Sequence, residues 1–167
     1  MTNHIVLFEP LFPANTGNIA RTCAGTNTVL HLIKPLGFST DDKHMKRAGL
    51  DYWDKLEIEE HKSLQDFLDK YKPEANNMFF ATTKAKHCYT DVDYSKFKNE
   101  DVFVLFGKET KGLPEDLLQK YIDKTIRIPM RPVLRSLNLS NSVCIIAYEI
   151  LRQIDFEGLQ GESQYFD

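Results

Sequence analysis

The chain has 167 residues, a length at which a single domain can bury a hydrophobic core. Its 42% hydrophobic and 27% charged residues are typical of a soluble globular protein. No apolar run reaches the roughly 20 residues of a membrane-spanning helix, so we expect no membrane contact. The net charge of −3 is unfavourable for RNA binding over the whole surface, but phosphate contacts need only local Lys and Arg.

The first residues and the cysteines favour the cytoplasm. The N-terminus reads MTNHIVLFEP, which has no basic segment before a long apolar stretch, so we expect no signal peptide. Cys23, Cys88 and Cys144 are far apart and form no CxxC pair, as suits reduced thiols. The five histidines show no HxxxH or HExxH pattern. Each is best explained as a surface or hydrogen-bonded histidine, and we expect no metal site.

Apolar runs alternate with helical patterns along the chain. In chain order we expect a strand at 5–8, a helix from about Asn18, a strand at 30–33, a helix at 63–71 capped by Ser63, strands at 78–82 and 102–106, a helix from Pro114, a strand at 125–128 and a helix through 143–154. This alternation predicts an α/β fold, a mainly parallel sheet with helices on both faces. We expect one domain over residues 1–157 and a loosely ordered tail over 158–167.

The first segment that carries chemistry is 15–26 (NTGNIARTCAGT), directly after the first predicted strand. Ligands of open α/β sheets bind at the carboxyl ends of strands. On a helix from Asn18, Arg21 shares an exposed stripe with Asn18 and Gly25, where a phosphate or a partner chain has room to approach. From these residues alone, a solvated surface arginine explains Arg21 equally well.

Two further segments follow predicted strands. In residues 106–114 (FGKETKGLP), Gly107 and Gly112 have the G-x4-G spacing of a phosphate-binding loop, but Leu-Pro replaces the Lys-Ser/Thr of an NTPase. The density of Gly, Lys, Glu and Thr favours a ligand loop over an ordinary turn. In residues 128–142, the polar side chains between Ser136 and Ser142 exceed what one helix cap requires. A small-molecule site explains this excess.

Together these segments resemble the motifs of the SPOUT methyltransferases. Within that superfamily the chain is similar to the TrmL/YibK group of tRNA (cytidine/uridine-2′-O-)methyltransferases, which modify the wobble nucleotide. The resemblance covers about residues 5–153. Its carriers are residues 15–24 (NTGNIARTCA), 41–52 (DDKHMKRAGLDY), 106–114 (FGKETKGLP), 128–130 (IPM) and 135–141 (RSLNLSN).

The resemblance implies a C-terminal trefoil knot, an exception to the rule that chains do not thread loops. It implies S-adenosylmethionine bound in the knot without metal, a homodimer, and tRNA recognised at the anticodon stem-loop. The implied cofactor contacts are Ala81, Thr82, Gly107, Ile128, Met130, Ser136 and Leu137.

Arg21 matches the catalytic arginine of these enzymes. A guanidinium stays protonated at neutral pH and is a poor general base, so we expect it to bind a phosphate and to stabilise the developing 2′-alkoxide. The resemblance adds Asn15 and Asn138 to the catalytic site. For substrate binding we expect Tyr148, on the outer stripe of the last helix, and the basic residues Lys46 and Arg47.

Two alternatives stay open. One is a methyltransferase of the same superfamily that modifies a different RNA site or a base, because paralogues share these motifs. The other is a non-catalytic RNA-binding module, against which Arg21 and the full polar segment at 135–141 argue. A Rossmann methyltransferase is disfavoured, because the loop after the first strand lacks a G-x-G-x-x-G pattern.

Overall fold

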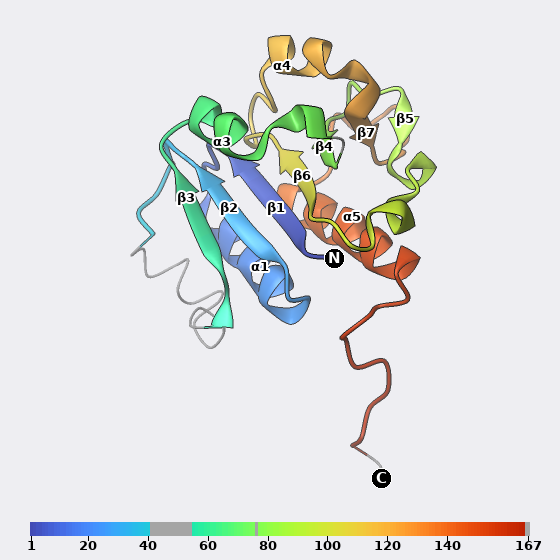
Figure 1. Cartoon of the computed structure of the whole chain (residues 1–167). Coiled ribbons are helices and arrows are strands. Elements are labelled where there is room, and N and C mark those ends of the chain that lie inside the picture. Colours follow the sequence, from blue (N-terminus) through green and yellow to red (C-terminus); the bar gives the residue numbers. More distant parts are fainter. Residues whose placement is uncertain (41–54, 76, 166–167) are drawn as a thin grey trace.

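The computed structural model describes residues 1–40, 55–75 and 77–165. Their strands form one sheet in the order β3-β2-β1-β6-β4-β7-β5, and every neighbouring pair is parallel (Figure 1). The strands are β1 Asn3–Phe8, β2 Val29–Ile33, β3 Ile58–His61, β4 Met78–Ala81, β5 His87–Cys88, β6 Val102–Phe106 and β7 Thr125–Arg127. The predicted α/β class and parallel sheet are confirmed.

Helices cover both faces of the sheet (Figure 1). The α-helices are α1 Pro13–Gly25, α3 Leu64–Tyr71, α4 Glu115–Lys120 and α5 Leu139–Gln153. Short 3-10 helices are η2 Pro73–Ala75, η3 Tyr89–Asp91, η4 Tyr94–Phe97 and η5 Ile122–Lys124. Helices α1 and α5 pack with the sheet in one buried cluster, and α3 and α4 contribute to a second cluster on the other face.

The alternation of side chains along β1 explains why the sheet needs helices on both sides. Ile5 and Leu7 belong to the cluster with α1 and α5, whereas Val6 and Phe8 belong to the cluster with α3 and α4. Successive side chains of a strand point to opposite faces, so a fully apolar strand is buried only between two helical layers.

The helix boundaries show what local sequence predicts well. Ser63 caps α3 as expected, since its Oγ accepts from the Asp66 N–H at 3.1 Å. The predicted start of the first helix at Asn18 was wrong, because α1 begins at Pro13. Pro114 is the N-cap of α4, one residue before the position expected for it.

Two strands were missed by the sequence analysis. Strand β3 reads IEEH and lies at the edge of the sheet beside β2, where polar side chains are tolerated. Strand β5 has only two residues at the opposite edge. Neither shows the apolar run by which the other strands were predicted.

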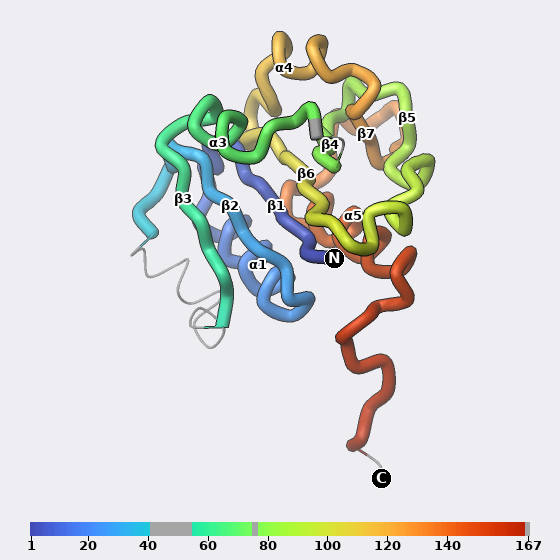
Figure 2. The backbone as a smooth tube through the Cα atoms, viewed as in Figure 1, coloured from blue at the N-terminus to red at the C-terminus, as the bar shows by residue number. Residues whose placement is uncertain are grey.

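The described end of the chain lies apart from the sheet. Residues 158–165 contain no helix or strand, and Figure 2 shows this segment running away from the body of the molecule after α5. None of the described helices has the length and apolar character needed to cross a membrane.

Candidate active site

A cavity of about 570 Å³ lies where β4, β6 and β7 end. This is where open α/β sheets bind ligands, and the volume falls within the roughly 300–1,000 Å³ of small-molecule sites. All the residues predicted as cofactor contacts line it, together with Asn15 and Asn138: Ala81, Thr82, Gly107, Ile128, Met130, Ser136 and Leu137. Residues from three separate segments therefore meet in one place.

One wall of the cavity continues the sheet beyond the end of β4. The Thr82 N–H donates to the Ile126 carbonyl at 2.9 Å, which extends the pairing of β4 with β7 past Ala81. The Thr82 hydroxyl accepts from the Lys84 N–H at 3.2 Å and holds the following turn. These bonds fix the backbone of this wall, and a fixed backbone can offer its polar groups to a ligand in a constant geometry.

The glycine loop after β6 is tight, and both of its glycines are required. A Cβ on Gly107 would lie 2.1 Å from the Gly112 carbonyl carbon and 2.2 Å from the Leu113 nitrogen. Gly112 has a φ of +71°, a conformation that residues with a Cβ rarely adopt. Its N–H closes the loop by donating to the Lys108 carbonyl at 2.9 Å. The two glycines of the G-x4-G spacing thus allow the two ends of the loop to lie in close backbone contact.

Glu109 ties this loop to α1. Its carboxylate accepts from the backbone N–H groups of Leu11 at 2.9 Å and Phe12 at 3.2 Å, and from Asn15 Nδ2 at 3.2 Å. A carboxylate beside a helix N-terminus satisfies free donors and is favoured by the helix dipole. Glu109 was not predicted as a site residue, because its partners lie 94 to 98 residues away in the chain.

Asn15 and Asn138 both line the cavity, and their side chains are in direct contact. Asn138 Nδ2 donates to Asn15 Oδ1 at 3.0 Å, while Asn138 Oδ1 accepts from the N–H groups of Ser140 at 2.9 Å and Asn141 at 3.3 Å. Asn138 is therefore both the N-cap of α5 and a partner of α1. The chain Glu109–Asn15–Asn138 connects the glycine loop, α1 and α5.

Arg21 lies on the exposed face of α1. Asn18, Arg21 and Gly25 are exposed, as the predicted stripe requires, and the opposite face is buried through Ile19 and Cys23. Arg21 is not among the residues that line the described cavity. The structure thus brings Asn15 and Asn138 together, and it places Arg21 further along the same helix.

Cys23 is structural by its environment. Burial raises the pKa of its thiol to about 12, so the thiolate needed for nucleophilic chemistry is scarce at neutral pH. Its side chain belongs to the buried cluster that α1 and α5 form with the sheet.

The predicted substrate-binding residues are only partly described. Tyr148 is 46% exposed on α5, next to Ile145 on the stripe expected to face a partner or RNA. Lys46 and Arg47 lie outside the described residues. Basic side chains border the cavity instead, at Lys84, Lys111, Arg127 and Arg135.

Comparison with known proteins assigns the chain to a family. Residues 2–148 match the SpoU rRNA Methylase family. The chain belongs to this family. A tRNA (cytidine(34)-2′-O)-methyltransferase of Yersinia pestis is 46% identical over 159 residues, covering 93% of this chain and 96% of that protein. A protein of Listeria monocytogenes serotype 4b (strain F2365), assigned the same activity, is 56% identical over 165 residues, 99% of this chain and 96% of that protein.

Solved structures of SpoU-type enzymes share this fold. One described under 2-OH methylation of C/U34 on tRNA superposes with a TM-score of 0.84 at 38% identity, covering 92% of this chain and 97% of that chain. An AdoMet-bound rRNA methyltransferase from Sinorhizobium meliloti superposes with a TM-score of 0.79 at 23% identity, covering 92% of this chain and 57% of that one. At that identity the second likeness concerns the fold alone.

Proposed function

We propose that this SpoU-family protein is a tRNA 2′-O-methyltransferase. It transfers a methyl group from S-adenosylmethionine to the ribose 2′-hydroxyl of the wobble nucleotide 34, a cytidine or a modified uridine. The observation that carries the proposal is the cavity at the strand ends, because the predicted cofactor contacts from three distant segments all line it. The activity assigned to relatives at 46% and 56% identity supports nucleotide 34 as the target.

The residues of the cavity fit S-adenosylmethionine. Gly107 packs directly against the backbone of Gly112 and Leu113, so backbone groups and not side chains form this part of the cavity wall. Ile128, Met130 and Leu137 offer apolar contacts to an adenine ring. Ser136 and Thr82 offer hydroxyls to ribose or to the amino-acid end. When bound, the cofactor would supply an electrophilic methyl group.

The protein's own groups would act on the RNA. We propose that the Arg21 guanidinium donates paired N–H bonds to a backbone phosphate and stabilises the 2′-oxygen as it loses its proton to water. Asn15 and Asn138, held by Glu109, would fix the start of α1 and of α5 on either side of the ribose. This arrangement supplies orientation and charge stabilisation, which are strongest when the negative charge develops.

A homodimer would bring exposed apolar surface together. Phe12 is 51% exposed at the start of α1, and Val133 and Leu134 are 73% and 57% exposed beside the cavity. Apolar patches of this kind mark contact surfaces, and two-fold dimers are the commonest assemblies. Light scattering at micromolar concentration should give about twice the 19.3 kDa chain mass. A monomer with full activity would contradict this part of the proposal.

The proposed knot and domain bounds rest on the resemblance to the same enzymes. We propose that residues of the C-terminal segment thread through a loop to form a trefoil knot around the cavity, with residues 1–157 as the domain and 158–167 as its tail. The convergence of the glycine loop, residues 128–138 and α5 on one cavity supports this. We also propose that the protein acts in the cytoplasm, where a tRNA substrate would be met.

The anticodon stem-loop would meet the basic residues around the cavity. Lys84, Lys111, Arg127 and Arg135 are placed to contact phosphates, and Lys46 and Arg47 stay predicted contacts. Such contacts release counterions, so the logarithm of the binding constant should fall linearly with the logarithm of the salt concentration. Net charge of the whole chain is no obstacle to a local patch of this kind.

Mapping of methylated nucleosides tests the proposal directly. Purified protein, S-adenosylmethionine and unmodified tRNA are incubated, and the tRNA is digested and analysed by mass spectrometry. We expect a 2′-O-methyl group at nucleotide 34 and none in a tRNA with 2′-deoxyribose at that position. Methylation elsewhere or on a base would identify an enzyme with another RNA site. Binding of tRNA and cofactor without transfer would identify a non-catalytic module.

A further inference from the structure

A second cluster of polar side chains lies within the sheet, away from the cavity. His4 on β1, His31 on β2 and His61 on β3 are all buried. His4 Nδ1 lies 2.8 Å from His31 Nε2, and His31 Nδ1 lies 3.0 Å from His61 Nε2. We call these three residues the histidine cluster. Their spacings of 27 and 30 residues explain why no local motif revealed them.

The strand register adds a carboxylate to this cluster. His31 pairs with Glu59 across β2 and β3, and Glu59 and His61 lie two residues apart on one face of β3. His31 Nδ1 is 3.7 Å from Glu59 Oε2, and His61 Nε2 is 3.7 Å from Glu59 Oε1. One ligand atom from each of these three residues lies within 4.8 Å of the others.

We propose that His31, His61 and Glu59 form a divalent transition-metal site, for which zinc has the best-matched chemistry. Zinc binds imidazole nitrogen and carboxylate oxygen at about 2.0–2.2 Å, so two tetrahedral ligand atoms lie on the order of 3.3 Å apart. The observed separations of 3.0 Å and 3.7 Å lie on either side of this value. Small side-chain movements are enough to accept the ion.

The two imidazoles have lone pairs available at neutral pH. Burial lowers the pKa of His31 and of His61, which favours the uncharged form of both rings. A neutral imidazole is the form that ligates metals, because the bound nitrogen must be deprotonated.

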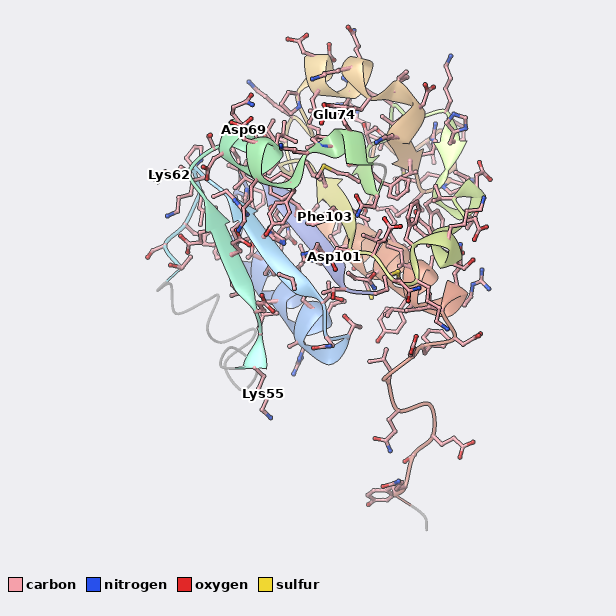
Figure 3. The ribbon with its side chains drawn as sticks, viewed as in Figure 1. Lys55, Lys62, Asp69, Glu74, Asp101 and Phe103 are labelled. Atoms are coloured by element: carbon pink, nitrogen blue, oxygen red, sulfur yellow. The ribbon has the colours of Figure 1, made fainter. Side chains whose placement is uncertain are left out.

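Neighbouring groups are placed to orient the ligands. With His31 Nε2–H donating to His4 Nδ1, the His31 Nδ1 lone pair is directed to the metal. His4 then carries its hydrogen on Nε2, which lies 3.7 Å from the carboxylate of Asp101 and has no hydrogen-bond partner among the described residues. His61 Nδ1 lies 4.0 Å from Asp66. Asp101 directly precedes β6, and Figure 3 labels it near Phe103. The Phe103 ring stacks on His4.

Metal binding moves one shared proton from one nitrogen of His61 to the other. In the metal-free cluster His61 Nε2–H can donate to His31 Nδ1; with the ion between them, that proton moves to His61 Nδ1, facing Asp66. Glu59 also contacts Lys70 and accepts from the Tyr71 hydroxyl at 2.6 Å. Lys70 is exposed and can turn into water, which leaves Glu59 free to ligate. The bound ion would join β2 to the edge strand β3.

Zinc titration of the metal-stripped full chain tests the site. We expect one zinc ion per chain by calorimetry and a higher thermal unfolding midpoint with zinc, because a ligand that binds only the folded state stabilises it. Glu59→Gln keeps the shape of a half-exposed side chain and should weaken binding by at least about tenfold. His61→Asn should abolish binding.

A matched control uses the exposed histidine of β5. His87→Ala should leave zinc affinity and stoichiometry unchanged, because His87 lies at the opposite edge of the sheet. The proposal is overturned by folded wild-type protein that takes up no zinc at about 100 µM, a concentration far above that at which typical structural zinc sites fill. It is equally overturned if Glu59→Gln binds normally, or if His87→Ala loses the ion. All these readouts are independent of methyl transfer.

Discussion

The cavity and the histidine cluster are two polar regions of one sheet, built in opposite ways. At the cavity, short side chains and backbone groups follow the ends of strands and stay open to a ligand. In the histidine cluster, the buried imidazole rings of β1, β2 and β3 form hydrogen bonds to one another. Buried polar groups must find partners within the protein, whereas groups at strand ends can keep theirs for a ligand.

This difference separates function from stability. A substitution at the cavity changes few buried contacts and should act on cofactor binding or methyl transfer. A substitution in the histidine cluster leaves buried nitrogens without partners and should act on the free energy of unfolding. The following experiments break or sharpen that distinction.

The largest effect is expected at Arg21. Arg21→Ala should lower the rate of methyl transfer by on the order of 100- to 1,000-fold, the usual loss on removal of one preorganised donor to a developing negative charge. Cofactor affinity should stay nearly unchanged, because Arg21 is not among the residues that line the cavity. Transfer of labelled methyl to tRNA and cofactor calorimetry measure the two quantities.

Arg21→Lys is the matched variant for this test. A point charge cannot reproduce the paired donors of the guanidinium, so lysine should restore little activity. Wild-type turnover in the alanine variant would show that Arg21 has no catalytic role. It would then be a surface arginine, the alternative that the sequence left open.

The next effect is expected at Gly107. Gly107→Ala places a Cβ 2.1 Å from the Gly112 carbonyl carbon, so the loop must open and cofactor affinity should fall at least about tenfold. Gly25→Ala is the control, because a Cβ there has nothing within 4 Å. Calorimetry with S-adenosylmethionine compares the two variants. Equal affinities would mean that the glycine loop does not form the cofactor site.

A stability effect without a functional one is expected at His31. His31→Ala leaves His4 Nδ1 and His61 Nε2 without partners, and each unsatisfied buried group costs roughly 1–3 kcal/mol. His87→Ala, at an exposed position, should change stability by no more than about 0.5 kcal/mol. Urea unfolding measures both. Reduced cofactor affinity in folded His31→Ala would remove the separation between the two regions.

The smallest effect is expected at Glu109, which joins structure to function. Glu109→Ala removes the acceptor for the Leu11 and Phe12 N–H groups and should cost about 1 kcal/mol, as loss of a helix cap does. Methyl transfer should fall as well, because Asn15 loses a partner. Glu100→Ala, at an exposed position, is the control. Unchanged stability and transfer would show that the cap is dispensable.

The sequence by itself determined the parts of this protein that depend on near neighbours. Alternating apolar runs predicted the α/β class and five of the strands, because side-chain period follows directly from backbone geometry. Ser63 as a cap and the glycine loop were also predicted, since their partners lie within five residues. The cofactor contacts were predicted from a resemblance, and most of their loops were also predicted from the residues themselves, because each loop follows a strand.

Only the tertiary structure decided which distant groups meet. Glu109 caps a helix 97 residues earlier in the chain, and Asn138 bonds to Asn15 across 123 residues. The histidines looked scattered because their contacts depend on the register of three parallel strands, which no local pattern encodes. The residues directly before α1 likewise donate to Glu109, a partner supplied by the glycine loop. Strand order and register bring such groups within bonding distance, and both are set by packing of the whole sheet.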